Sequence, residues 1–337
     1  MKLLKQLYEI YSPSGKEDKM MAFLKAECLL MGAKVVEDAG NLYALKGEAE
    51  TYPCVVAHTD QVQSAACRAF QAKDIVFGLS LDGRSFQGLG ADDKNGIWIA
   101  LKCLQTFDTI KVAFFREEET GCRGSAKATV AFFDNCRFVI QCDRKGGKDF
   151  INRIGGMQIC SEEFVKDAKI KDFGFKKETG MMTDVQKLRN LGVKVSCCNI
   201  SCGYYEPHSA REYTILPELK NTLAFVKSII RNCTKVYEYK EPVRKAYNDG
   251  WGYNGGGYSG GYNGGGYSGG YGGGRTLWDR VSDLEDVSDI HEQSISDLLT
   301  DFKNLSKRVA GLEKQALKKG KVIPTETVVT PDDLPIV

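Results

Sequence analysis

The sequence has little of the charge asymmetry, histidine and long apolar runs that mark several large classes of protein. Its 46 Lys and Arg residues nearly balance its 44 Asp and Glu residues, so we expect no basic surface for nucleic acid or an anionic membrane. No apolar run is long enough to span a bilayer, and the opening MKLLKQLYEIYSPSG is too short and polar for a signal peptide. We therefore expect neither a nucleic-acid partner nor a membrane partner.

The twelve cysteines lack the CxxC spacing of structural zinc ribbons and thioredoxin-like redox sites. They lie between Cys28 and Cys233, and without an export signal they fit a reducing, cytoplasmic compartment. Cys197, Cys198 and Cys202 are close enough in sequence to bind a metal in principle. The first two fall in an apolar run typical of a strand, which favours a role for the cysteines as small buried hydrophobes.

Residues 1–245 have the pattern of one α/β domain. Four apolar runs have the length and the β-branched or aromatic content of strands, and four helical patterns lie between and around them. Strands that alternate with helices predict a mixed, mainly parallel sheet sandwiched by helices. The expected strands are Pro53–Ala57, Ile110–Phe115, Arg137–Gln141 and Val193–Ile200, and the expected helices are Lys16–Leu30, Lys94–Phe107, Thr183–Leu191 and Pro217–Asn232.

The composition changes abruptly after this domain. Residues 246–275 contain the repeat YNGGGYSGG at 253–261 and 262–270, and such a Gly/Tyr-rich segment predicts a flexible linker. Residues 276–318 carry apolar positions at alternating steps of four and three, which predicts a coiled-coil helix and a homo-oligomer formed through it. An amphipathic helix packed on the catalytic domain would give the same pattern. Residues 319–337 are expected to be an irregular tail.

Acidic residues and the two histidines of the α/β domain gather in five short motifs, four of which end an apolar run. Ligands of open α/β sheets collect outside the carboxyl ends of the strands, so these motifs are expected to converge. They are VVAHTD with His58 and Asp60, GLGADDKNG with Asp92 and Asp93, FFREEETG with Glu117, Glu118 and Glu119, FVIQCD with Asp143, and GYYEPHSAREY with His208.

These residue types suit metal-assisted hydrolysis. A neutral imidazole such as His58 binds zinc, and Asp60 can accept its other ring N–H. Each motif alone also has an ordinary interpretation, as a histidine at a strand end, a helix cap or a solvated charge run. In order, however, they supply two nitrogen and three oxygen ligands plus a general base, which suits two zinc ions about 3.5–4 Å apart.

With these residues in place, the sequence resembles the co-catalytic zinc exopeptidases, a superfamily that includes peptidase T, the glutamyl and deblocking aminopeptidases and the single-domain bacterial zinc aminopeptidases. The resemblance covers roughly residues 1–235. Beyond the metal motifs, it includes SPSGKED at 12–18, DAGNLYALKG at 38–47, GCRGS at 121–125 and MTDV at 182–185.

The resemblance implies a role for each site residue and two zinc ions per chain, with cobalt or manganese as substitutes. Glu118 is expected to be the general base, and Asp60 to orient one ligand. A cis peptide bond is expected after the bridging residue, between Asp92 and Asp93. The expected ligands are His58 and Asp143 for one zinc, Glu119 and His208 for the other, and Asp92 as the bridge. With three consecutive glutamates, a slip of one residue in these roles stays open.

The spacing of the motifs departs from some of these relatives. Peptidase T-like enzymes insert a domain between the fourth and fifth ligands, but only 64 residues separate Asp143 from His208. The glutamyl-type aminopeptidases insert one between the first histidine and the bridging aspartate, but only 33 residues separate His58 from Asp92. We therefore expect a compact catalytic unit, with assembly left to the C-terminal helix.

The expected activity is hydrolysis of a peptide or amino-acid amide, with an aminopeptidase favoured. A free substrate N-terminus would need a carboxylate, for which Glu117 or Glu206 is available. A free C-terminus would need a cation such as Arg144 or Lys145, which would indicate a carboxypeptidase or an N-acyl amino-acid amidohydrolase instead. A non-catalytic binding or assembly protein that reuses the fold is the alternative from another class, but no ligand or base is missing from the sequence.

Overall fold

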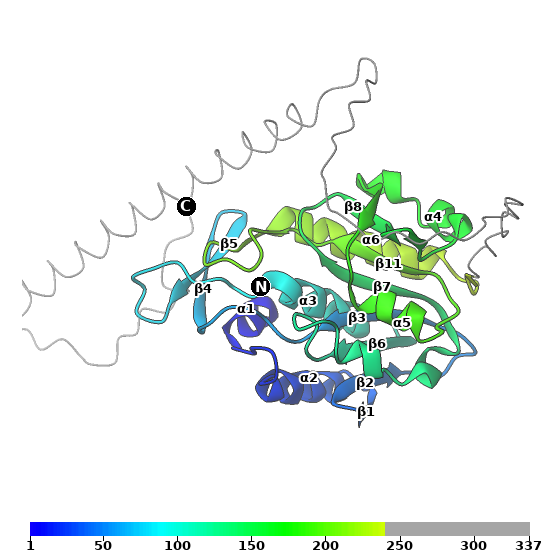
Figure 1. The fold of residues 1–337 in the computed structure, drawn as a ribbon, viewed down its shortest axis with the longest axis horizontal. Coiled ribbons are helices and arrows are strands. Elements are labelled where there is room, and N and C mark those ends of the chain that lie inside the picture. Colours follow the sequence, from blue (N-terminus) through cyan, green and yellow to red (C-terminus); the bar gives the residue numbers. More distant parts are fainter. Residues whose placement is uncertain (240–337) are drawn as a thin grey trace, which may run out of the picture. The chain divides into compact units, whose positions relative to one another are not determined.

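The computed structural model describes residues 1–239 (Figure 1). The described residues belong to one compact unit. The linker, coiled-coil helix and tail expected at 246–275, 276–318 and 319–337 lie outside the described residues and stay predictions. Within the described part of the chain, no helix is both long and apolar enough to cross a bilayer.

A nine-stranded mixed sheet forms the centre of the domain, in the order β1-β2-β6-β3-β7-β11-β8-β10, with β9 paired to β8. Its central strands β6, β3, β7 and β11 run parallel, and β8 and β10 are also parallel to each other. The strands are β1 Lys34–Asp38, β2 Asn41–Lys46, β3 Tyr52–His58, β6 Ile110–Phe115, β7 Cys136–Arg144, β8 Asp149–Ile154, β9 Met157–Gln158, β10 Lys176–Gly180 and β11 Cys197–Ser201.

Helices cover both faces of this sheet. Val55 and Ala57 of β3 belong to one apolar cluster, and the alternate residues Cys54 and Val56 belong to a second cluster. The first cluster includes residues of α1, α2, α3, α4 and α6, while α5 contributes to the second. The helices are α1 Lys2–Glu9, α2 Asp18–Leu30, α3 Ala91–Thr106, α4 Glu162–Asp167, α5 Asp184–Asn190 and α6 Leu216–Asn232, with 3-10 turns η1 Ser125–Lys127, η2 Val130–Phe133 and η3 Ile170–Phe173.

A second, four-stranded antiparallel sheet has the order β12-β13-β5-β4. The Tyr8 hydroxyl in α1 donates to Asn95 Oδ1 in α3 at 2.5 Å and lies 2.9 Å from Thr214 Oγ1 in β13, which fixes this sheet to the main domain. The loop between β12 and β13 carries His208. The strands are β4 Cys67–Ala72, β5 Ile75–Ser80, β12 Tyr204–Tyr205 and β13 Tyr213–Ile215.

The predicted α/β class with a mixed, mainly parallel sheet is confirmed. The strand expected at Val193–Ile200 is wrong in its first half, because the strand begins only at Cys197. Val193 instead donates its N–H to Leu188 O at 3.0 Å and closes the end of α5. The expected apolar run is therefore divided. Its first part follows α5, and its second part, from Cys197, belongs to β11.

All twelve cysteines are free and buried, as expected for small hydrophobes. Cys197 packs in the second apolar cluster, and Cys198 and Cys202 pack in the first. Because these clusters lie on opposite faces of the sheet, the three thiols do not converge on one metal.

Phe225 provides a test of the first apolar cluster. Its ring is fully buried and lies 4.6 Å from the Phe175 ring, centroid to centroid. Phe225→Ala is expected to lower the free energy of unfolding by about 3–5 kcal/mol, because it removes buried apolar area and leaves a cavity. Urea unfolding followed by circular dichroism measures this. Leu30→Ala, at a side chain 82% exposed, is the control; equal losses in the two variants would contradict the packing described.

Candidate metal centre

The predicted site residues meet at the carboxyl ends of the central parallel strands. His58 is the last residue of β3, and Glu118 and Glu119 lie in the loop that follows β6. Asp143 lies near the end of β7, next to β3 in the sheet. Asp92 comes from the first turn of α3, and His208 comes from the loop of the second sheet.

Two groups of side chains form within this site, and each holds one histidine. In the first, His58 Nε2 lies 3.1 Å from Asp92 Oδ1 and 3.7 Å from Asp143 Oδ1. In the second, His208 Nε2 lies 3.4 Å from Asp92 Oδ2 and 3.0 Å from Glu119 Oε1. Within each group the candidate ligand atoms lie within 4.8 Å of one another. Asp92 belongs to both groups and presents a different oxygen to each.

The chemistry of these donors fits divalent cations. Glu119 Oε1 is buried and, within the described part of the chain, accepts no hydrogen bond, although His208 Nε2 is 3.0 Å away. A neutral imidazole nitrogen and a carboxylate oxygen that face each other in this way both have a lone pair to offer a metal. The residues present therefore fit a metal at each group.

The ionisable groups of the site strongly perturb one another. Burial, together with the Asp92 carboxylate, raises the pKa of Asp143 well above its usual range. Burial acts on Asp92 in the same sense, but the contacts with His208 and His58 outweigh it and lower the pKa of Asp92. Contacts with Asp92 and Glu119 raise the pKa of His208 to about 10. Buried like charges of this kind need positive partners.

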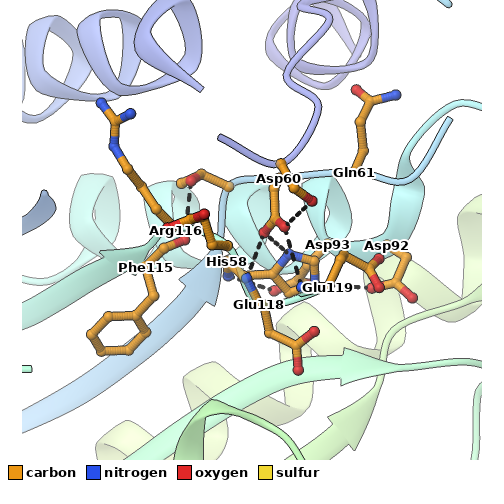
Figure 2. Close-up of polar contacts among 12 residues, drawn as sticks. His58, Asp60, Gln61, Asp92, Asp93, Phe115, Arg116, Glu118 and Glu119 are labelled. Carbon is orange, nitrogen blue, oxygen red and sulfur yellow. Dashed lines mark hydrogen bonds and ion pairs between the residues drawn. The ribbon is translucent and has the colours of Figure 1, made fainter. Parts of the chain in front are cut away.

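Asp60 connects the first histidine to the glutamate loop (Figure 2). Its Oδ1 lies 3.2 Å from His58 Nδ1 and accepts the Glu118 N–H at 2.9 Å. Its Oδ2 accepts the Ser14 hydroxyl at 2.7 Å and the Glu119 N–H at 3.2 Å. Burial opposes ionisation of Asp60, but the contact with His58 and these donors lower its pKa overall. One carboxylate thus fixes both the ring of His58 and the backbone of the glutamates.

The three consecutive glutamates have different surroundings. Glu119 faces His208, while Glu118 lines the cavity and accepts the Cys122 thiol at 3.3 Å. Burial raises the pKa of Glu118. Glu117 does not line the cavity, and its carboxylate lies 3.4 Å from Arg123. Of the three, only Glu118 combines a place in the cavity with the absence of a histidine contact.

Asp93 follows the shared carboxylate through a cis peptide bond, as the resemblance implied. Its Oδ2 accepts the His58 N–H at 3.2 Å, and its Oδ1 accepts the Gly96 N–H at 3.0 Å. Asp93 therefore holds the backbone of the site, and it belongs to neither histidine group.

Two buried charged residues that lie inside the second and fifth motifs, but were not singled out as site residues, hold the turn before Asp92. Glu212 accepts the Gly90 N–H at 2.6 Å and the Asp92 N–H at 3.1 Å. Lys94 donates to Leu89 O at 3.1 Å and to Tyr8 O at 3.2 Å. Burial lowers the pKa of Lys94 to about 8 and raises that of Glu212 to about 8. In the sequence, both residues are ordinary members of polar segments, so no spacing pattern distinguishes them.

A cavity of about 360 Å³ opens beside the two groups. Its wall includes residues of both histidine groups together with Glu118, and it continues past the metal site onto further segments of the main sheet and its loops. The lining residues are Asp92, Glu118, Glu119, Asp143, Arg144, Lys145, Ile151, Gly180, Met181, Met182, Thr183, Asn199, Tyr204, Pro207 and His208.

No family model matches the chain, and no curated protein matches it. Solved structures do match. Aminopeptidase PepT from Bacillus cereus is 14% identical with a TM-score of 0.59, over 69% of this chain and 98% of that one. A tripeptidase from Staphylococcus aureus is 15% identical with a TM-score of 0.57, over 69% and 97%. An aminopeptidase from the archaeon Desulfurococcus kamchatkensis is 17% identical with a TM-score of 0.52, over 68% and 93%.

The chain has the fold of these aminopeptidases. The resemblance that the motifs indicated is therefore confirmed at the level of the fold. At 14–17% identity, the likeness concerns the fold alone, and the roles of individual residues rest on the geometry of the site.

Glu212 provides a test of how the site is held. Glu212→Ala leaves the buried N–H groups of Gly90 and Asp92 without their acceptor, at about 1–3 kcal/mol each. We expect the free energy of unfolding of the metal-free protein to fall by about 2–6 kcal/mol. Glu48→Ala, at a side chain 93% exposed, should change it little. Urea unfolding compares the two, and an unchanged midpoint for Glu212→Ala would show that the turn is held in another way.

Proposed function

We propose that the protein is a two-zinc aminopeptidase. The observation that carries this proposal is the position of Asp92, whose two oxygens face two separate histidine groups. A carboxylate placed in this way can bridge a pair of metals. His58 and Asp143 would hold one zinc, and Glu119 and His208 the other, with cobalt or manganese as substitutes. The fold shared with solved aminopeptidases supports peptide hydrolysis as the activity.

In this mechanism, bound zinc would supply an acidified water and a Lewis acid for the substrate carbonyl. The Glu118 carboxylate accepts a proton from the attacking water and returns it to the leaving nitrogen. Its burial favours this exchange, because it raises the pKa of the carboxyl toward neutrality. Asp60 Oδ1 contacts both the His58 ring and the Glu118 N–H, and so fixes the position of one relative to the other. The cavity admits the substrate beside these groups.

A carboxypeptidase or N-acyl amino-acid amidohydrolase is the second candidate function. It is favoured by the cavity wall, which includes Arg144 and Lys145 and neither Glu117 nor Glu206. The non-catalytic alternative has less support, since both histidine groups and Glu118 are in place.

Two further proposals concern the whole chain. We expect a homo-oligomer formed through residues 276–318, which lie outside the described residues. We also expect a cytoplasmic location, with which twelve free cysteines agree.

Replacement of adjacent glutamates tests the proposed function. Glu118→Gln is expected to lower kcat about 100-fold or more, because it removes the proton acceptor while the ligands remain. Glu117→Gln is the matched control and should retain activity, since Glu117 faces Arg123. Product release from unblocked and N-acetylated peptides is followed by mass spectrometry with zinc present.

Full activity in Glu118→Gln would contradict the mechanism. Loss of activity in Glu117→Gln alone would shift the base by one residue. Turnover of only the N-acetylated peptides would replace the aminopeptidase with the second candidate.

A further inference from the structure

The acidic and the basic residues of the cavity wall have different proposed roles. Its acidic lining residues are the ligands Asp92, Glu119 and Asp143 and the base Glu118. The remaining charged residues of the wall are the histidine ligand and two cations, Arg144 and Lys145. Once the acidic residues are engaged with metal and water, the wall presents positive charge to the rest of the substrate. This part of the cavity is suited to an anionic group.

Arg144 belongs to the cavity wall and has one hydrogen-bond partner in the described part of the chain. It is the last residue of β7 and follows Asp143 directly. Its Nε donates to Asp149 Oδ2 at 3.4 Å, and its side chain is 28% exposed. Asp149 is itself anchored, because its N–H donates to Ser201 Oγ at 3.1 Å. The guanidinium is therefore oriented by a partner on one edge only.

The other edge of this guanidinium has no partner among residues 1–239, where Asp149 is the single hydrogen-bond acceptor of the side chain. Two parallel N–H donors at the end of an arginine match the two oxygens of a carboxylate. Lys145 adds a second cation, and its backbone is fixed by the Ser201 hydroxyl, which donates to Lys145 O at 2.9 Å. An arginine of the cavity wall whose terminal donor pair has no acceptor among residues 1–239 can bind a carboxylate.

We propose that Arg144 binds a carboxylate on the leaving-group side of the scissile bond, so that the enzyme acts on short peptides. The proposal rests on the proposed peptidase function. The cavity of about 360 Å³ is near the lower end of the range for ligand sites, which agrees with a small substrate. The carboxylate has two sources in such a peptide, namely the free C-terminus of a dipeptide or tripeptide and an acidic side chain after the scissile bond.

Substrates that differ only in this carboxylate test the proposal. The pairs are Leu-Gly against its C-terminal amide, and Leu-Glu amide against Leu-Gln amide. The zinc-loaded full chain is expected to prefer the acid of at least one pair by roughly tenfold or more in kcat/KM, mainly through KM. Preference within the first pair assigns the carboxylate to the C-terminus, and preference within the second pair assigns it to a side chain.

Three variants relate this preference to Arg144. Arg144→Gln is expected to reduce the ratio of acid to amide to about one, and Arg144→Lys to restore part of it, because the charge is kept without the paired donors. Arg153→Gln is the matched control, since Arg153 is an exposed arginine of β8 outside the cavity wall. Damage to the fold would lower both members of a pair together and would leave the ratio unchanged.

The proposal is overturned if the wild-type chain cleaves both members of each pair equally, or if Arg144→Gln keeps the preference. Calorimetric titration of Leu-Gly and its amide into the zinc-loaded Glu118→Gln variant decides the case without turnover. The acid is expected to bind roughly tenfold more tightly, and the further change Arg144→Gln should remove this advantage. If no peptide is cleaved but the acid still binds through Arg144, the proposed function fails while the carboxylate receptor stands.

Discussion

The repulsion among buried carboxylates governs this molecule more than any other interaction. Asp92, Asp143, Glu118 and Glu119 line one cavity, and burial raises the pKa of Asp143 and Glu118. Water cannot screen such charges, so they are stable together only beside positive partners. Two histidines lie 3.0–3.7 Å from these carboxylates and supply positive charge only when they are protonated. In our account two metal ions supply the positive charge instead, and the histidines bind them as neutral ligands.

The fold holds the charged residues of the site in place by hydrogen bonds to their backbone N–H groups. Asp60 accepts the N–H groups of Glu118 and Glu119, Glu212 accepts that of Asp92, and Asp93 accepts that of His58. Three parallel strands bring the segments to one edge of the sheet, and the small second sheet adds His208 from outside it. These backbone hydrogen bonds position the segments that carry the site, as preorganised catalysis would require.

Much of this could be predicted from the sequence, for definite reasons. Strand β3 is buried on both faces, so it is a continuous apolar run, and His58 at its end is conspicuous. The same holds for the glutamates after β6 and for Asp143 in β7. The second sheet was not predicted, because β12 and β13 are only two and three residues long and β4 and β5 are partly exposed. Their pairing also depends on contacts between distant segments. Glu212 and Lys94 were missed for a related reason: their burial is a property of the packed turn at Leu89–Asp92, and their own neighbours in sequence are polar.

The central claim is that Asp92 joins two metal sites in one centre, and metal stoichiometry tests it most directly. Metal-free protein is saturated with zinc, freed of excess ion and measured by elemental analysis. We predict two zinc ions per chain, one in His208→Ala, where a single group loses its histidine, and fewer than one in Asp92→Ala, where both groups lose a ligand. One zinc or none in the saturated wild-type chain, or two retained in Asp92→Ala, would contradict the account.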